Sequence, residues 1–430
     1  MVTVSASSGR PYHLIIYGAS GFTGQFVVEE VARTSSEGPK GNLKWAIAGR
    51  SRPKLEKVLE QAAEALGRPD LKSVDIIIAD VGEPESLAAM CRQGVIVLNC
   101  VGPYRFFGEP VVQACVENGA HLLDVSGEPQ FLEGIQLNYH DKASEQGVYI
   151  IGSCGFDSIP ADMGVIYTRD QFKGTLTTVE SFLSANTGPE GARLNEGTWQ
   201  SAIYGLADSS KLRSLRKKFG HKPLPVVGTK IKRRSALFFS REMQQYAVPF
   251  MGTDPSVVKR TQRYLAEELH ESPVQYGAYV GIGGISSVFK FLFFGMMFWF
   301  MVKCSFGRKL LIKKNIYIFL TFVFFGEGYT EDQDPSQGKP NAKIRTVVQG
   351  PEPGYVATPI SMVQAAITIL NEPESLPKKG GVYTPGSAFG KTTIIKRLDK
   401  HGIKFSIMRQ IYLFFSLIKR RIIYTDHTGY

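Results

Sequence analysis

The sequence has few cysteines, and none of them is arranged for metal binding or catalysis. The five cysteines form no C-x-x-C pair and no metal-ligand spacing: Cys91, Cys100, Cys115, Cys154 and Cys304. Several lie in apolar strand or helix contexts, which predicts buried, reduced thiols. The chain also has no N-x-S/T sequon, and its serine-rich N-terminus lacks a hydrophobic signal core. These absences favour the reducing, cytosolic side of membranes, and no metal site is predicted.

Acidic residues are in the minority, with 39 Asp and Glu against 50 Lys and Arg, a net charge of +11. Two basic groups, at residues 303–314 and 419–421, flank very apolar runs, which suits an anionic membrane surface better than a nucleic acid duplex. No helix-turn-helix, zinc-finger or RNA-binding signature is present, so nucleic acid is not predicted as a partner. The 43% hydrophobic and 21% charged residues are typical of a globular protein, and 430 residues are enough for two domains.

The strongest motif is a glycine-rich turn between an apolar strand, residues 13–17, and a helix with an apolar face. Its spacing is G-x-x-G-x-x-G, and its position is that of the first β-α-β unit of a dinucleotide-binding fold. The first glycine permits the tight turn, the second lets the backbone approach a pyrophosphate, and the third lets helix and strand pack closely. The pyrophosphate is expected on the N–H groups at the helix start. The predicted cofactor-binding residues of this turn are Gly18, Ser20, Gly21, Phe22, Thr23 and Gly24.

The end of the second predicted strand, residues 44–48, indicates which coenzyme binds. An acid at this point would accept hydrogen bonds from a ribose 2′-hydroxyl, whereas an arginine can pair with a 2′-phosphate. The sequence offers Arg50 and Ser51 and no acid, which favours NADP over NAD. Asp80 ends the third strand, where such folds often contact the adenine. Gly102 follows the fourth, at the carboxyl edge where ligands bind in open sheets.

Strands and helices alternate over the first 165 residues, as in a doubly wound parallel sheet. Within this pattern Pro110 is predicted to open the helix that ends at Glu117. We therefore predict an α/β fold with a Rossmann dinucleotide-binding domain at 1–165, a second α+β substrate domain at 166–355, and a C-terminal segment at 356–430.

The least ordinary stretch is 276–325, rich in Gly, Phe and Met, with one charge, Lys290, before Lys303. Each uninterrupted apolar run is too short for a confident transmembrane helix, which needs about 20 residues. A buried core of the substrate domain, an interfacial or hairpin membrane anchor, and a single span that tolerates Lys290 by snorkelling all remain open.

Residues 18–24, 48–50, 100–104, 124–128 and 155–162 together resemble the saccharopine dehydrogenase-like oxidoreductases, from the N-terminus to about Phe405. The resemblance implies a Rossmann domain, an inserted α+β substrate domain, and a C-terminal segment that returns to the Rossmann side. Residues 406–430 diverge from that family. The resemblance also implies association with lipid droplets and membranes, or with mitochondria. Bacterial relatives include trans-acting enoyl reductases of lipid and polyketide assembly.

The first functional hypothesis is an NADP-dependent oxidoreductase that reduces a carbonyl or enoyl group on a lipid-linked or thioester-linked substrate. Tyr104 is the candidate proton donor, because a phenol at the edge of the fourth strand should face the nicotinamide. Asp157 and Asp162 are rivals if burial raises their pKa values. Saccharopine is not the predicted substrate, because the substrate domain shows no paired-arginine cluster.

The alternative is a protein that binds the membrane or lipid-droplet surface and keeps the nucleotide fold without turnover. The sequence leaves a homodimer open.

Overall fold

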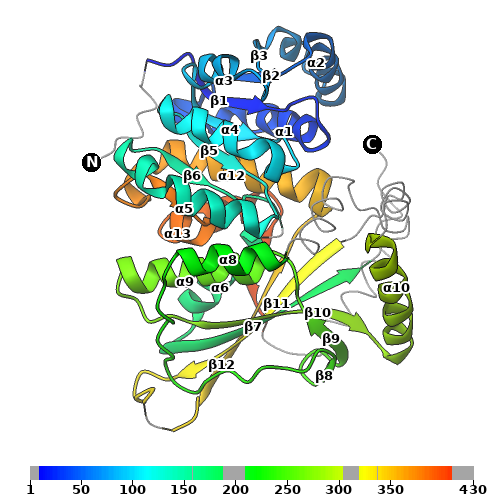
Figure 1. Ribbon diagram of the computed structural model, residues 1–430, viewed down its shortest axis with the longest axis vertical. Helices are drawn as coiled ribbons and strands as arrows, with labels where there is room; N and C mark the ends of the chain where they lie inside the picture. Colours follow the sequence, from blue (N-terminus) through cyan, green and yellow to red (C-terminus); the bar gives the residue numbers. More distant parts are fainter. Residues whose placement is uncertain (1–8, 157, 187–208, 304–318, 337, 409–430) are drawn as a thin grey trace.

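The computed structural model of the chain describes residues 9–156, 158–186, 209–303, 319–336 and 338–408 (Figure 1). Two seven-stranded sheets organise it, in the orders β13-β6-β5-β4-β1-β2-β3 and β14-β12-β11-β7-β10-β9-β8. Strands of the first sheet pair in parallel, and helices lie on both of its faces. The predicted class, α/β with a Rossmann doubly wound sheet beside an α+β part, is confirmed.

The first sheet forms where the sequence has short, nearly continuous apolar runs, as expected of parallel strands covered on both faces. Its strands are β1 (Tyr12–Tyr17), β2 (Trp45–Gly49), β3 (Ile76–Ile78), β4 (Gly94–Asn99), β5 (His121–Asp124), β6 (Tyr149–Ile151) and β13 (Gly381–Tyr383). The helices between them are α1 (Phe22–Arg33), α2 (Arg52–Leu66), α3 (Pro84–Cys91), α4 (Tyr104–Glu117) and α5 (Pro129–Glu145), with single turns η1 (Ser35–Glu37), η2 (Pro39–Gly41) and η3 (Pro69–Ser73). All side chains of β4 are buried, so this strand lies at the centre of the core.

The predicted helix start at Pro110 is wrong. Helix α4 begins at Tyr104 and carries Pro110 in its interior. The Glu128 carboxylate accepts hydrogen bonds from the Tyr104 backbone N–H (3.0 Å) and from Arg105 Nε (3.0 Å). These contacts from the next loop stabilise the helix start at Tyr104, directly after Pro103.

The second sheet is mixed, with β10 parallel to β7 and antiparallel pairs elsewhere. Its strands are β7 (Thr175–Asn186), β8 (Phe238–Ser240), β9 (Gln245–Pro249), β10 (Gln275–Gly283), β11 (Phe319–Tyr329), β12 (Ala342–Gln349) and β14 (Lys404–Ile407). The accompanying helices are α6 (Ser158–Gln171), α8 (Ser209–Lys218), α9 (Asp254–Glu268) and α10 (Ile285–Lys303). Helix α6 packs on β11 so closely that a Cβ at Gly164 would lie 2.2 Å from the Phe324 ring.

The apolar stretch 276–325 divides into parts with different environments. Residues 276–283 lie in β10, and residues 319–325 lie in β11, where Phe322 and Phe324 are buried. Helix α10 between them stands at one side of the second sheet (Figure 1). Most of its large side chains among residues 285–297 are exposed. Residues 304–318 lie outside the described part. The core alternative therefore holds for β11, whereas most large side chains in the described part of α10 lie outside the core.

One helical segment of the described chain, Pro353–Asn371, is long and apolar enough to cross a membrane. It comprises a π-helical turn, η4 (Pro353–Ala357), and helix α12 (Thr358–Asn371). Every residue of α12 from Pro359 to Leu370 is buried, and the helix packs against α1 in the first half of the fold. This segment is therefore a core helix.

After α12 the chain contributes to both sheets. Strand β13 extends the first sheet beside β6, and β14 extends the second beside β12. Between them lie α13 (Pro385–Phe389) and α14 (Ile394–Lys400), and η5 (Pro373–Ser375) precedes them. Of the divergent tail 406–430, residues 406–407 belong to β14, and residues 409–430 lie outside the described part.

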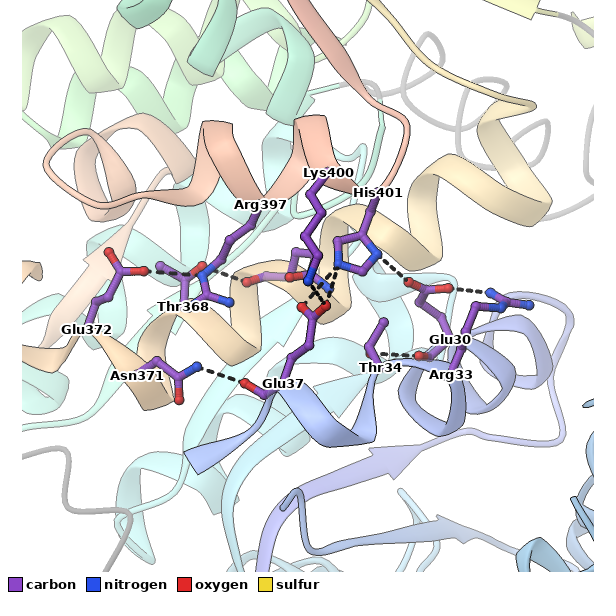
Figure 2. Close-up of polar contacts among 11 residues, drawn as sticks. Glu30, Arg33, Thr34, Glu37, Thr368, Asn371, Glu372, Arg397, Lys400 and His401 are labelled. Carbon is purple, nitrogen blue, oxygen red and sulfur yellow. Dashed lines mark hydrogen bonds and ion pairs between the residues drawn. The ribbon is translucent and has the colours of Figure 1, made fainter. Parts of the chain in front are cut away.

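A polar network connects the C-terminal segment after α12 to α1 and to the turn η1 that follows it (Figure 2). The Lys400 ammonium lies 2.6 Å from the Glu37 carboxylate, and the His401 ring lies 3.1 Å from Glu37 and 3.8 Å from Glu30. Burial raises the pKa of Glu30, although Arg33 and His401 oppose that shift. On the neighbouring side, Arg397 contacts Glu372. The C-terminal segment is thereby held against the helix that follows the glycine turn.

Candidate functional site

The strand order of the first sheet reverses between β1 and β4. The helices that follow these two strands, α1 and α4, lie on opposite faces of the sheet. Open α/β sheets bind ligands in the crevice outside this point. The glycine turn follows β1 and the Cys100–Tyr104 segment follows β4 at this point, and Gly18 lies against Val101 of the second segment. The sequence-predicted cofactor residues of both segments therefore meet at one place.

The turn between β1 and α1 depends on glycine at two positions. Gly18 has a φ of +82°, and a Cβ there would lie 2.7 Å from a Val101 methyl group. A Cβ at Gly24 would lie 2.2 Å from the Gly18 carbonyl oxygen and 2.8 Å from Ala19 Cα. Backbone atoms cannot move aside as a flexible side chain can. Gly18 and Gly24 thus have the turning and close-packing roles that the spacing predicts.

The first turn of α1 is open to an anion. Gly21 occupies the N-cap position in an extended conformation, and no side chain of the described chain caps the helix. Ser20 and Gly21 are exposed, whereas Phe22 and Thr23 are partly exposed, and this turn contains no acid. The first N–H groups of a helix lack intrahelical partners and lie at the positive end of its dipole. The residues present therefore fit a coenzyme pyrophosphate.

Arg50 follows β2 beside the same edge. Its side chain is 75% exposed, and its Nε lies 4.0 Å from Asp80 Oδ2, while Asp80 Oδ1 accepts a hydrogen bond from the Gly82 N–H (2.9 Å). An exposed pair at this distance contributes little stability, so the guanidinium can turn toward a phosphate. Ser51 occupies the N-cap position of α2 without making a side-chain cap bond. Arg50, Ser51 and the start of α2 form an environment suited to a 2′-phosphate.

After β4, Gly102 is exposed and Tyr104 is buried. The Tyr104 hydroxyl donates a hydrogen bond to the Asn99 carbonyl (2.8 Å) and accepts one from the Val125 N–H (3.3 Å). Burial, and secondarily the Asp124 carboxylate, raise the pKa of Tyr104 well above its ordinary value. The hydroxyl thus joins the ends of β4 and β5. Its predicted role as a proton donor stays a prediction.

The two acids proposed as alternative donors differ in what the structure says of them. Asp162 lies in α6 and is fully buried, and its Oδ2 accepts hydrogen bonds from Thr261 Oγ1 (2.7 Å) and the Gly386 N–H (2.7 Å). Burial raises the pKa of Asp162 to about 6. Asp157 lies outside the described residues.

Two features of the site were not predicted. Asp124, at the end of β5, is buried and accepts hydrogen bonds from the Ser126 and Ser153 N–H groups, and burial raises its pKa to about 6. An acid at a strand end is a signal that the sequence does contain. Tyr355, in η4, packs its ring against Phe22. No local pattern indicates that contact, because the two residues are distant in the sequence.

Comparison with known proteins gives consistent matches. The profile of the saccharopine dehydrogenase NADP binding domain matches residues 14–151. A human protein named saccharopine dehydrogenase-like oxidoreductase is 56% identical over 423 residues, 94% of this chain and 99% of that protein. A Caenorhabditis elegans protein named lipid droplet localized protein is 39% identical over 425 residues, 92% and 98% of the two chains.

Two more distant matches extend the comparison. A Mycobacterium tuberculosis protein named for trans-acting enoyl reductase activity is 30% identical over 268 residues, 60% of this chain and 56% of that protein. The solved structure of Saccharomyces cerevisiae saccharopine dehydrogenase (L-Glu forming) aligns with a TM-score of 0.53 at 12% identity, covering 92% and 100% of the chains. At 12% identity, the similarity to the yeast structure supports only the assignment of the fold.

Proposed function

The chain belongs to the saccharopine dehydrogenase-like oxidoreductases and binds NADP, and from this premise we propose its reaction and its place of action. It reduces a carbonyl or enoyl group on a lipid-linked substrate at the surface of a lipid droplet or membrane. The proposal draws on the glycine turn and Arg50 for the coenzyme, and on α10 for the surface. The name of the mycobacterial relative supports an enoyl group, and the name of the worm relative supports a lipid droplet.

The observation that carries the proposal is the exposure of α10. Eight large apolar side chains of this helix are 44–68% exposed: Ile285, Phe289, Phe291, Leu292, Phe293, Phe294, Met296 and Met297. Residues 291–294 are consecutive, so their side chains point to all sides of the helix. A water-facing helix of a globular protein normally has a polar face, and an all-apolar helix is normally buried. A lipid surface provides the burial that the second sheet does not.

NADPH, when bound, supplies the hydride for the reduction. The residues of the chain position the reacting groups. The first turn of α1 holds the pyrophosphate, Arg50 holds the 2′-phosphate, and the Tyr104 hydroxyl keeps the β4 and β5 loops together beside the crevice. Tyr104, Asp157 and Asp162 remain the proposed proton donors. Among them Tyr104 begins α4, directly after the carboxyl end of β4.

A second candidate function is a lipid-surface protein that binds NADP without turning over a substrate. The observation in its favour is that Tyr104 and Asp162 are both buried and hydrogen-bonded to protein groups. A proton donor must reach the substrate directly or through one water.

The deciding experiment follows NADPH oxidation in the presence of phospholipid-coated droplets, over a panel of 2-enoyl thioesters, 3-keto thioesters and long-chain ketones. Turnover of one class, reduced in Arg50→Ala, supports the oxidoreductase. NADPH binding without oxidation of any compound supports the second function. Fractionation of cells then tests the location, and recovery in mitochondria instead of droplets would contradict the proposed surface.

A further inference from the structure

An aromatic ring from the crossover between the two sheets lies against the start of the phosphate-binding helix. The crossover runs from the end of β12 to α12 and contains the turn η4. The Tyr355 ring lies edge-on to Phe22 (centroids 4.8 Å apart) and to Phe26 (5.1 Å). Phe22 and Phe26 are neighbours on one face of α1, with centroids 5.8 Å apart. Two segments distant in the sequence thus share one cluster of three rings.

The position of Tyr355 is fixed on both sides along the chain. The Glu352 carboxylate accepts a hydrogen bond from the Tyr355 N–H, and the Glu352 carbonyl accepts one from the Ala357 N–H (2.9 Å). On the far side, Thr358 Oγ1 accepts a hydrogen bond from the Phe156 N–H (3.1 Å). Single π-helical turns are rare in proteins, and those that occur are often found at functional sites. The ring is therefore presented by a defined turn and not by a loose loop.

The cluster lies on the β4 side of α1. Helix α12, which follows η4 directly, packs against α1, β4 and β5, and its Met362 sulfur lies 4.0 Å from Cys100 Sγ at the end of β4. Arg50 lies on the other side, after β2. In a dinucleotide fold the adenosine half lies toward β2, and the nicotinamide half continues toward β4. Tyr355 is thus beside the pyrophosphate and nicotinamide half.

We infer that Tyr355 is a positioning residue for that half of the coenzyme. It holds Phe22, the first residue of α1, so that the N–H groups of the first turn keep the direction that the pyrophosphate needs. Because Tyr355 belongs to the crossover, coenzyme binding and the placement of the second sheet become coupled. The inference rests on the proposed NADP-dependent function and identifies a residue of the same site.

The test compares two probes, NADPH and adenosine 2′-monophosphate, which keeps the 2′-phosphate and lacks both the pyrophosphate and the nicotinamide half. Dissociation constants are measured for the wild type, Tyr355→Ala, Tyr355→Phe and Arg50→Ala. Tyr355→Ala should raise the Kd of NADPH about 10-fold and that of adenosine 2′-monophosphate less than about 2-fold. Tyr355→Phe, which keeps the ring, should restore NADPH binding. Arg50→Ala should weaken both probes.

Tyr167→Ala is the matched control, because Tyr167 is also partly buried and contacts one ring, Phe405, on the second sheet. It should leave both constants unchanged. If Tyr355→Ala does not fold, Phe26→Leu removes the second ring that contacts Tyr355 and should show the same split between the probes in weaker form. The inference is overturned if the Tyr355 variants bind NADPH as the wild type does, or weaken both probes equally. A wild type that binds neither probe would instead overturn the proposed function.

Discussion

Replacing exposed apolar side chains of α10 should release the protein from lipid without destabilising it. The variant is Phe289→Ser, Phe293→Ser and Met296→Ser, which lie on one helix face and are 68%, 62% and 58% exposed. Full burial of such a side chain is worth about 1.5–3 kcal/mol, so burial of the exposed part is worth roughly 1 kcal/mol each. The three together should lower the partition coefficient about 100-fold.

The assay is flotation with phospholipid-coated droplets over a range of lipid concentrations. The control replaces exposed apolar side chains outside α10, in the triple variant Val226→Ser, Phe239→Ser and Met251→Ser, which are 51%, 47% and 79% exposed. It should change partitioning less than about 3-fold, since these residues lie outside the surface that we assign to lipid. Equal losses in the two variants would refute the assignment. Unfolding of the α10 variant would show that the helix belongs to the core.

Three further predictions concern the first sheet and its surroundings. Gly24→Ala should destabilise the fold by about 2 kcal/mol in urea and abolish NADPH binding, because its Cβ would meet the Gly18 carbonyl, whereas Gly134→Ala, with nothing within 4 Å, should not destabilise it. Tyr104→Phe should cost about 1 kcal/mol of stability and reduce NADPH oxidation more than about 100-fold, because Tyr104 is the first proposed proton donor. An oxidation rate within about 3-fold of the wild type would instead remove Tyr104 as the acid. Because the folded-state pKa of Asp162 is raised to about 6, its contribution to stability should fall as pH rises from about 4 to 6, by about 3 kcal/mol in total. Asp162→Asn should remove that part of the pH dependence, and an unchanged stability profile from pH 4 to 7 would contradict the assignment.

The first sheet could be predicted from the sequence because its signals are local. Parallel strands buried on both faces appear as short apolar runs, and the glycines of the turn are required by contacts within a few residues, such as Gly24 on Gly18. Arg50 is recognisable for the same reason, since its position follows from the end of β2. The start of α4 was mispredicted because Glu128, a residue of the next loop, determines it.

The apolar stretch could not be interpreted from composition alone. Phe324 in β11 and Phe293 in α10 belong to similar apolar runs, yet Phe324 is fully buried and Phe293 is 62% exposed. The difference arises from Gly164 of α6, which leaves room for the Phe324 ring, whereas no described element covers Phe293 in this way. Tyr355 likewise gives no local signal, because its partner Phe22 lies at the opposite end of the chain. Such contacts depend on the completed fold.

The most direct test of the account is the coenzyme preference and its dependence on Arg50. The Kd values of NADPH and NADH are measured for the wild type, Arg50→Ala and the control Arg92→Ala, whose guanidinium is 52% exposed and pairs with Glu85. A hydrogen bond to a charged group is worth about 1.5–3 kcal/mol, so Arg50→Ala should weaken NADPH binding roughly 10- to 100-fold. NADH binding and the control should be unchanged. Equal affinity of the wild type for both coenzymes, or equal weakening of both in Arg50→Ala, would contradict the account.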